Sequence, residues 1–194
     1  MITFMKRFEL LSLFFVLTLL FAACGSRQQQ PAGCTLRFTF APEAYTDGAL
    51  LDADYHQLCT FPVEGGEWSY TFPDSCKRPA LAYLALSNKN DSTAFIHLPF
   101  VIEQGAIQVR LGDVFVMTGT PLNKLLNDFY LALEALSDNC KKDAKMDQVK
   151  TLFSEFYKQQ ILSNRTNVLA PFILKEYGHA LLPKDKEEVE AVLK

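Results

Sequence analysis

The chain has 194 residues, a formal net charge of -3 at pH 7, and a composition that is 49% hydrophobic and 12% aromatic. Such an apolar composition can bury a core, which excludes an intrinsically disordered protein. The length suits one domain, or one domain with a small appendage. The mild acidity excludes the basic surface that nucleic-acid-binding proteins need, and it leaves no polybasic patch for anionic lipids. Membrane association must therefore come from a covalent anchor or from a partner.

Residues 1–23 have the features of a secretory signal peptide. Lys6 and Arg7 form a short basic region, and a mostly apolar run follows from Leu10 to Ala23. The run is shorter than the ~20 residues of a membrane-spanning helix, but it has the length of a signal-peptide hydrophobic region. We therefore expect export and cleavage after residue 23, with translation starting at either of the two methionines before the basic pair.

The residues at the expected cleavage point, Phe-Ala-Ala-Cys at 21–24, resemble the lipobox of bacterial lipoproteins. Small residues suit the shallow pockets of the peptidase, and Cys24 supplies the thiol that takes the lipid, such as palmitate. An ordinary secretory signal with a chance cysteine is the alternative. We expect residues 24–33 to be a lipidated polar tether. The absence of aspartate after Cys24 resembles the sorting pattern of outer-membrane lipoproteins. No acidic run follows Cys24 either, which argues against display on the outer face, so we expect an outer-membrane protein that faces the periplasm.

Residues 34–119 predict a β-rich domain, because short apolar–polar runs alternate with turn residues. The runs that predict strands are 35–40, 58–63, 67–72, 80–87, 93–102, 106–111 and 114–118. Gly65 and Gly66 predict a hairpin turn between the second and third runs, since glycine adopts the positive φ of such turns. Pro99 predicts a bulge or an edge position in the fifth run. A set of about seven strands favours an antiparallel β-sandwich or an open barrel.

Residues 120–194 predict a small helical segment, so the fold class is α+β. Apolar residues recur there at a spacing of three to four, which is typical of amphipathic helices. The expected helices are Leu122–Leu136, Met146–Gln160, Thr166–Gly178 and Lys184–Leu193. Thr120 suits a helix cap and Pro121 the first helical position, whereas Pro171 is acceptable only in a first turn. The segment is too small for an independent domain, and we expect it to pack on the β half or on a partner.

Two stretches, Leu-Pro-Phe-Val-Ile-Glu-Gln-Gly-Ala-Ile at 98–107 and Met-Thr-Gly-Thr-Pro-Leu-Asn at 117–123, resemble a known family. Together with the glycine turn and aromatic strand of 63–72, they are similar to a domain of unknown function in lipoproteins of Bacteroides-type Gram-negative bacteria. There the domain precedes a thioredoxin-like domain of the thiol-disulfide interchange or peroxiredoxin type. The resemblance implies association with thiol-redox machinery and carries over no catalytic residue. The chain departs from the family by ending where the thioredoxin-like domain would begin. Turn chemistry alone explains 103–105 and 119–121.

The sequence offers no recognisable catalytic, cofactor or metal site, and it holds no Cys-x-x-Cys dithiol. Asp52, Asp54 and His56 lie close together and could contact a metal, but carboxylates at this spacing are typical of a solvated face. His97 falls in an apolar run, where a core or rim position is the simpler interpretation. We expect a binding or scaffolding module in the envelope with a protein partner. The alternative is a hydrolase or redox accessory enzyme with an unrecognised site near Asp54, His56 or His97.

Two modifications are predicted besides the lipid. Four cysteines follow Cys24, at positions 34, 59, 76 and 140, and an oxidising envelope permits disulfides between them, with three full connectivities. Cys34 and Cys76 form the candidate pair, because both are expected at the ends of elements. Ser92 is a candidate for O-glycosylation, since Asp-Ser-Thr at 91–93 lies on a predicted turn and resembles a short envelope glycosylation motif. A plain polar turn is the alternative.

Overall fold

The computed structural model describes residues 33–40, 45–63, 66–73, 78–112, 115–140 and 144–193. These residues all belong to one compact unit, Pro31–Lys194. The predicted signal peptide, Cys24, nearly all of the tether and Cys76 lie outside the described residues. The side chain of Ser92 does so too.

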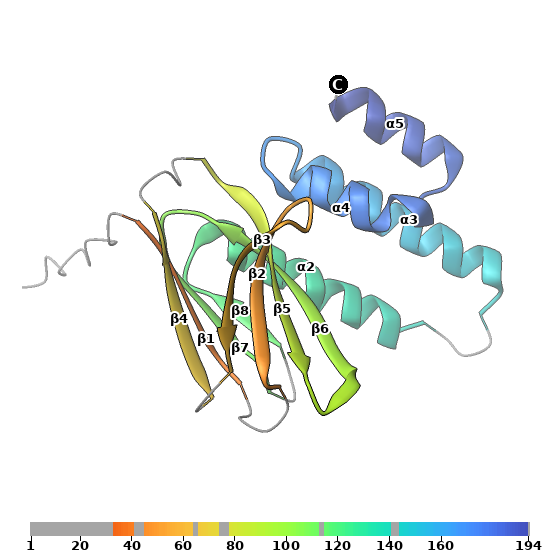
Figure 1. Cartoon of the computed structure of the whole chain (residues 1–194). Helices are drawn as coiled ribbons and strands as arrows, with labels where there is room; N and C mark the ends of the chain where they lie inside the picture. Colours follow the sequence, from red (N-terminus) through yellow and green to blue (C-terminus); the bar gives the residue numbers. More distant parts are fainter. Residues whose placement is uncertain are drawn as a thin grey trace, which may run out of the picture. The chain divides into compact units, whose positions relative to one another are not determined.

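The β-rich half forms two four-stranded sheets, of which sheet A has the strand order β4-β1-β7-β8 and sheet B the order β3-β2-β5-β6 (Figure 1). The strands are β1 (Cys34–Thr39), β2 (Asp47–Asp52), β3 (Gln57–Pro62), β4 (Glu67–Phe72), β5 (Ala80–Asn88), β6 (Asp91–Ile102), β7 (Gly105–Arg110) and β8 (Val116–Thr118). Neighbouring strands are antiparallel except β1 and β7, which run parallel. The β-sandwich-like prediction is confirmed, and the sheets do not close into a barrel.

The predicted hairpin between residues 58–63 and 67–72 is wrong. β3 pairs with β2 in sheet B, whereas β4 pairs with β1 in sheet A, so the connection crosses from one sheet to the other. Gly66 does adopt the expected positive φ, at 76°. The two runs face each other because both carry aromatic side chains that pack across the core, where Phe61 of β3 stacks on Trp68 of β4. A glycine turn between two strands of alternating apolar and polar residues is therefore equally compatible with a hairpin and with a connection between two sheets.

Strand β2, which carries glycine and two aspartates in six residues (DGALLD), was not predicted. It lies between β3 and β5. Gly48 of β2 pairs with Phe61, and a Cβ at this glycine would lie 2.2 Å from the Phe61 ring. The missing side chain therefore makes room for an aromatic ring, which is a role that strand propensity does not register.

The helical half contains, among the described residues, α2 (Pro121–Asp138), α3 (Met146–Ser163), α4 (Leu169–Tyr177) and α5 (Pro183–Leu193), with a short 3-10 turn η1 (Gly178–Ala180) after α4. These elements agree with the predicted helices. Pro121 occupies the start of α2, and Pro171 lies in the first turn of α4, where no backbone donor is lost.

The helices and sheets share one hydrophobic core. Leu36, Phe38 and Phe100 fill the space between the sheets, and Phe129 and Ile173 of the helices belong to the same cluster of buried side chains. None of these five side chains is more than 3% exposed. The prediction that the helical segment packs on the β half is therefore confirmed.

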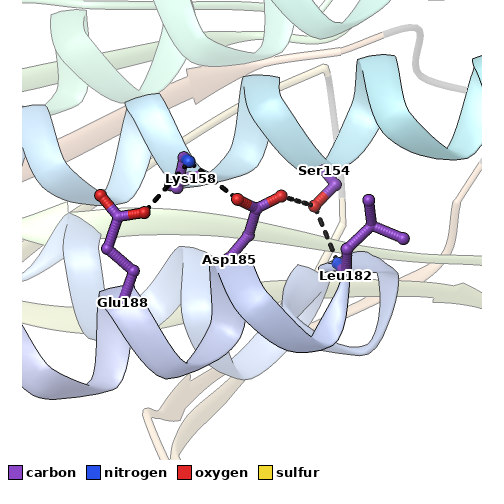
Figure 2. A network of polar contacts seen from close by, with 5 residues as sticks. All are labelled: Ser154, Lys158, Leu182, Asp185 and Glu188. Atoms are coloured by element: carbon purple, nitrogen blue, oxygen red, sulfur yellow. Dashed lines mark hydrogen bonds and ion pairs between the residues drawn. The ribbon is translucent and has the colours of Figure 1, made fainter.

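A polar network fixes α5 against α3 (Figure 2). The Ser154 hydroxyl donates to Asp185 at 2.6 Å and accepts the backbone N–H of Leu182 at 2.8 Å. The Lys158 ammonium donates to Asp185 at 2.7 Å and to Glu188 at 3.2 Å. Ser154 is fully buried and Asp185 is 8% exposed, so these bonds hold the last helix in position.

Candidate binding groove

Helix α2 forms hydrogen bonds with an edge strand of each sheet. β6 is an edge strand of sheet B and β8 an edge strand of sheet A. The side-chain amide of Asn123 accepts the N–H of Val101 in β6 at 2.8 Å and donates to its carbonyl at 2.7 Å. One turn later on the same helix face, Asn127 accepts the N–H of Met117 in β8 at 2.7 Å. The two asparagines thus satisfy backbone groups that sheet edges normally leave open.

The N-terminus of α2 is capped from outside the helix. The Glu103 carboxylate accepts the N–H of Leu122 at 2.7 Å and that of Asn123 at 3.1 Å. Thr120 occupies the cap position but makes no capping bond with its side chain; its hydroxyl instead accepts a bond from Asn123 at 2.8 Å. The expected cap position of Thr120 is confirmed, but the side chain that caps the helix is that of Glu103. A carboxylate at a helix N-terminus also complements the helix dipole, so both stretches quoted for the resemblance have a structural role.

A groove of about 500 Å³ lies between β6 and the C-terminal part of α2. Its lining residues are His97, Leu98 and Pro99 from β6, Phe115, and Asn127, Tyr130, Leu131, Leu133, Glu134, Ser137 and Asp138 from α2. The lining is largely apolar, and Leu131 remains 46% exposed. Glu134 and Asp138 lie one helical turn apart and give the helix side of the groove an acidic character.

The backbone of β6 is open along this groove. Val101 directs its N–H and carbonyl away from β5, toward Asn123. Strand geometry alternates, and the β5–β6 register is regular from Val101 to Phe95. Pro99, His97 and Phe95 therefore also direct their backbone groups away from β5. Pro99 has no N–H to lose on that side, which confirms its predicted edge position.

The His97 side chain belongs to an aromatic cluster on the outer face of sheet B. The Tyr55 ring stacks on Tyr83 with centroids 4.7 Å apart and on His97 at 5.9 Å, and Phe95 meets His97 edge-on at 4.4 Å. Glu176 of α4 accepts the hydroxyls of Tyr83 at 2.9 Å and of Tyr55 at 3.3 Å. Burial, reinforced by these hydrogen bonds, raises the pKa of Tyr83, so its hydroxyl stays a donor at physiological pH.

Sequence reasoning missed this cluster, because its members come from three distant parts of the chain and none forms a local motif. Tyr55, in the turn after β2, has a φ of 65°. The neighbouring Lys175 of α4 donates to the carbonyl of Ala53 at 2.7 Å and lies 5.0 Å from the Tyr55 ring centroid. These contacts join α4 to the turn after β2.

The candidate polar group near residue 54 is a turn. One Asp52 oxygen accepts the backbone N–H groups of Asp54 and His56, at 2.8 and 2.9 Å, and the other lies 3.2 Å from the His56 imidazole. The backbone bond from His56, more than any other contact, lowers the pKa of Asp52. His97 and His56 are both exposed. Within the described part of the chain, no group of three His, Cys, Asp or Glu side chains could hold a metal ion.

The cysteines lie in different environments. Cys34 is fully buried at the start of β1. Cys59 is half-buried in β3, and burial raises the pKa of its thiol. Cys140 follows α2. The predicted partner of Cys34, Cys76, and the lipidated Cys24 lie outside the described residues, so the disulfide and the lipid anchor remain predictions, as does the glycan on Ser92.

No helix in the described ranges is long and apolar enough to cross a membrane. Comparisons with protein-family models, with curated proteins and with solved structures gave no match.

Proposed function

We propose that this protein is a lipid-anchored protein of the cell envelope, held in the outer membrane through Cys24 and facing the periplasm, and that its folded domain binds a protein partner. The observation that carries the binding role is the groove between β6 and α2, which combines an apolar lining with open backbone groups. Contiguous exposed apolar surface with a polar rim is typical of interaction sites. The resemblance of residues 98–107 and 117–123 supports an association with thiol-redox machinery.

The side chains around the groove support binding rather than self-stabilisation. Leu131, which lines the groove, is 46% exposed, and Phe95, whose ring contacts His97, is 58% exposed. The contacts that the structure gives to His97 are with the rings of Tyr55, Tyr83 and Phe95. Such an imidazole suits the wall of a recognition site. For this reason we favour a binding module over the hydrolase or redox accessory enzyme.

The anchor is tested by Cys24→Ser, with Cys59→Ser as the matched control. The thiol of Cys24 is the expected acceptor of the lipid, so its loss should move the exported protein from the membrane to the soluble periplasmic fraction. The control variant should stay with the membrane. Unchanged partitioning of Cys24→Ser into detergent would contradict the anchor.

The groove is tested by site-specific photo-crosslinking in the native envelope. A photoreactive amino acid replaces Leu131 in the groove or, as the control, Leu152 of α3, which is similarly exposed at 42%. We expect discrete adducts only from position 131, and we expect Leu133→Asp in the same chain to suppress them. Equal adduct yields from both positions would mean that the groove is not the binding site.

A further inference from the structure

We propose that the open stretch of β6 from Phe95 to Pro99 adds an extended segment of a partner polypeptide as a further strand of sheet B, seated in the groove against α2. The inference rests on the proposed binding function and names the class of partner. That class is a flexible segment in which apolar residues alternate and at least one lysine or arginine is present.

The backbone of β6 supplies the first part of the recognition. Two donors, the N–H groups of Phe95 and His97, and three acceptors, the carbonyls of Phe95, His97 and Pro99, point away from β5. β6 is an edge strand of sheet B, so no described strand pairs with these groups. A strand added about 4.8 Å away would satisfy them, as in other cases of β-augmentation.

Asn123 already shows this chemistry at the next outward position. Its amide gives Val101 one acceptor, at 2.8 Å, and one donor, at 2.7 Å, which is the pair of bonds that a neighbouring strand would provide. The side chain thus closes the edge at Val101. From Pro99 to Phe95 no described strand pairs with the outward groups, and His97 and Phe95 are exposed whereas Pro99 is buried. An incoming segment would begin where the asparagine ends.

The groove supplies the second part. Side chains of an added strand would alternate between two environments. One set would lie against Phe115, Tyr130 and Leu131 in the groove, and the other beside the paired rings of Phe95 and His97. Apolar residues in the first set would cover the exposed part of Leu131. The segment must be extended and alternating to use both environments.

Charge supplies the third part. Glu134 and Asp138 line the groove, both are exposed, and its lining includes no lysine or arginine. A basic side chain on the segment would therefore be attracted by the negative electrostatic potential of these two carboxylates. Exposed ion pairs contribute only about 0–1 kcal/mol, so the charge sets preference among segments, whereas the backbone and apolar contacts provide most of the affinity.

A second copy of this chain fits the edge less well. Antiparallel pairing of two β6 strands about His97 would place Pro99 of each copy opposite Phe95 of the other. Proline has no N–H, so both of these ladder hydrogen bonds would be missing. A foreign segment needs to accommodate Pro99 only once and can place a carbonyl elsewhere.

The test uses the mature chain with Cys24→Ser and the synthetic peptide Lys-Val-Thr-Val-Thr-Val-Lys, blocked at both ends, with amide NMR shifts as the readout. We expect the largest shifts at Phe95 and His97. Methylation of alternate peptide nitrogens should abolish binding. A peptide with glutamate in place of both lysines should bind more weakly by about two- to fivefold, and Glu134→Lys should reverse that preference.

Two edge variants change the donor count in opposite directions. His97→Pro removes an outward N–H without touching the bonds to β5, and we expect it to weaken binding by at least about fivefold. Pro99→Ala adds an outward N–H and should strengthen binding by about two- to fivefold. Thermal unfolding checks that each variant is folded. Pro99→Ala and Glu134→Lys keep the test decisive if His97→Pro does not fold.

Each other outcome overturns the inference in a recognisable way. Peptide binding that ignores nitrogen methylation and both edge variants would mean that the groove binds without strand addition. Adducts from position 131 without any peptide binding would mean a folded partner surface. A dimer that His97→Pro dissociates would mean a second copy. The loss of both the adducts and the peptide binding would overturn the proposed binding function as well.

Discussion

The indole of Trp68 stacks on the ring of Phe61, with ring centroids 3.6 Å apart and planes inclined by 17°. The two residues belong to different sheets, because β3 lies in sheet B and β4 in sheet A. Phe38 of β1 contacts both rings, at 5.6 and 5.2 Å. This aromatic group therefore joins the two sheets of the sandwich at the point where the chain crosses between them.

We predict that Phe61→Ala lowers the free energy of unfolding by about 3–5 kcal/mol, because it empties a buried site between the sheets. Phe95→Ala is the matched control, since Phe95 is 58% exposed and should lose less than about 1 kcal/mol. Chemical denaturation followed by the fluorescence of Trp68, the only tryptophan of the chain, measures both. Equal effects would contradict the inter-sheet contact.

The sequence predicted the elements better than their pairing. Helices such as α2 and α3 were predicted because their periodicity, and the proline that begins α2, are local properties. Whether Gly66 ends a hairpin or a crossing between sheets depends on which partners the flanking strands find far along the chain. β4 pairs with β1, and β3 pairs with β2, so β3 and β4 do not form a hairpin. No local pattern contains that choice.

The groove shows the same division. Pro99 predicted an edge strand, and the apolar stripe of α2 predicted a helix packed on the core. The two-sided hydrogen bonding of Asn123 to Val101, and the capping of α2 by Glu103, join residues about 20 positions apart in sequence. A polar side chain inside an apolar stripe was the available signal, since buried polar groups need partners.

We predict that Asn123→Ala destabilises the protein by about 2–4 kcal/mol. The change leaves the N–H and carbonyl of Val101 without the amide, in a region that is fully buried. Asn139→Ala is the control, because Asn139 is exposed and bonds only within its own helix end, so the expected loss is below about 0.5 kcal/mol. Thermal or urea unfolding compares the two variants. A neutral Asn123→Ala would mean that the edge of β6 is solvated there.

Gly119 should not tolerate a side chain. Its φ is 102°, and a Cβ would lie 1.9 Å from the carbonyl oxygen of Ala106. We predict that Gly119→Ala lowers the free energy of unfolding by at least about 2 kcal/mol, from backbone strain and displacement of β7. At Gly112 a Cβ would meet nothing within 4 Å, so Gly112→Ala should be nearly neutral in the same denaturation experiment. Similar losses at both glycines would rule out this explanation.

The disulfide between Cys34 and Cys76 stays a prediction, because Cys76 lies outside the described residues. Cys34 pairs with Phe72, the last residue of β4, and Cys76 follows Phe72 by four residues in the sequence. We expect a proteolytic map of the unreduced mature protein to contain linked peptides of 34 and 76. Reductant should lower the free energy of unfolding by about 2–4 kcal/mol, and equally so in Cys59→Ser. Full alkylation of both thiols without reductant would reject the pair.

The last prediction concerns acid. Hydrogen bonds from Lys158 first and from Ser154 second lower the pKa of Asp185 below its ordinary value. A carboxyl with a lowered pKa in the folded state contributes stability above its unfolded pKa of about 3.9, and this contribution is lost as the pH falls through the folded value. Wild type should therefore be more stable than Asp185→Asn from about pH 5 to about pH 7, because this range lies above the unfolded pKa.

The difference between the two proteins should shrink below about pH 4, where the carboxyl is protonated in the unfolded chain. Urea midpoints across the pH range measure it. Glu188→Gln is the control, because Glu188 is exposed and touches Lys158 at 3.2 Å, so its own difference from wild type should be small at every pH. The hydrogen bond with Asp185 also raises the pKa of Lys158, the other member of the pair. A constant difference between wild type and Asp185→Asn from pH 7 down to about pH 2 would show that packing, and not charge, fixes α5 to α3.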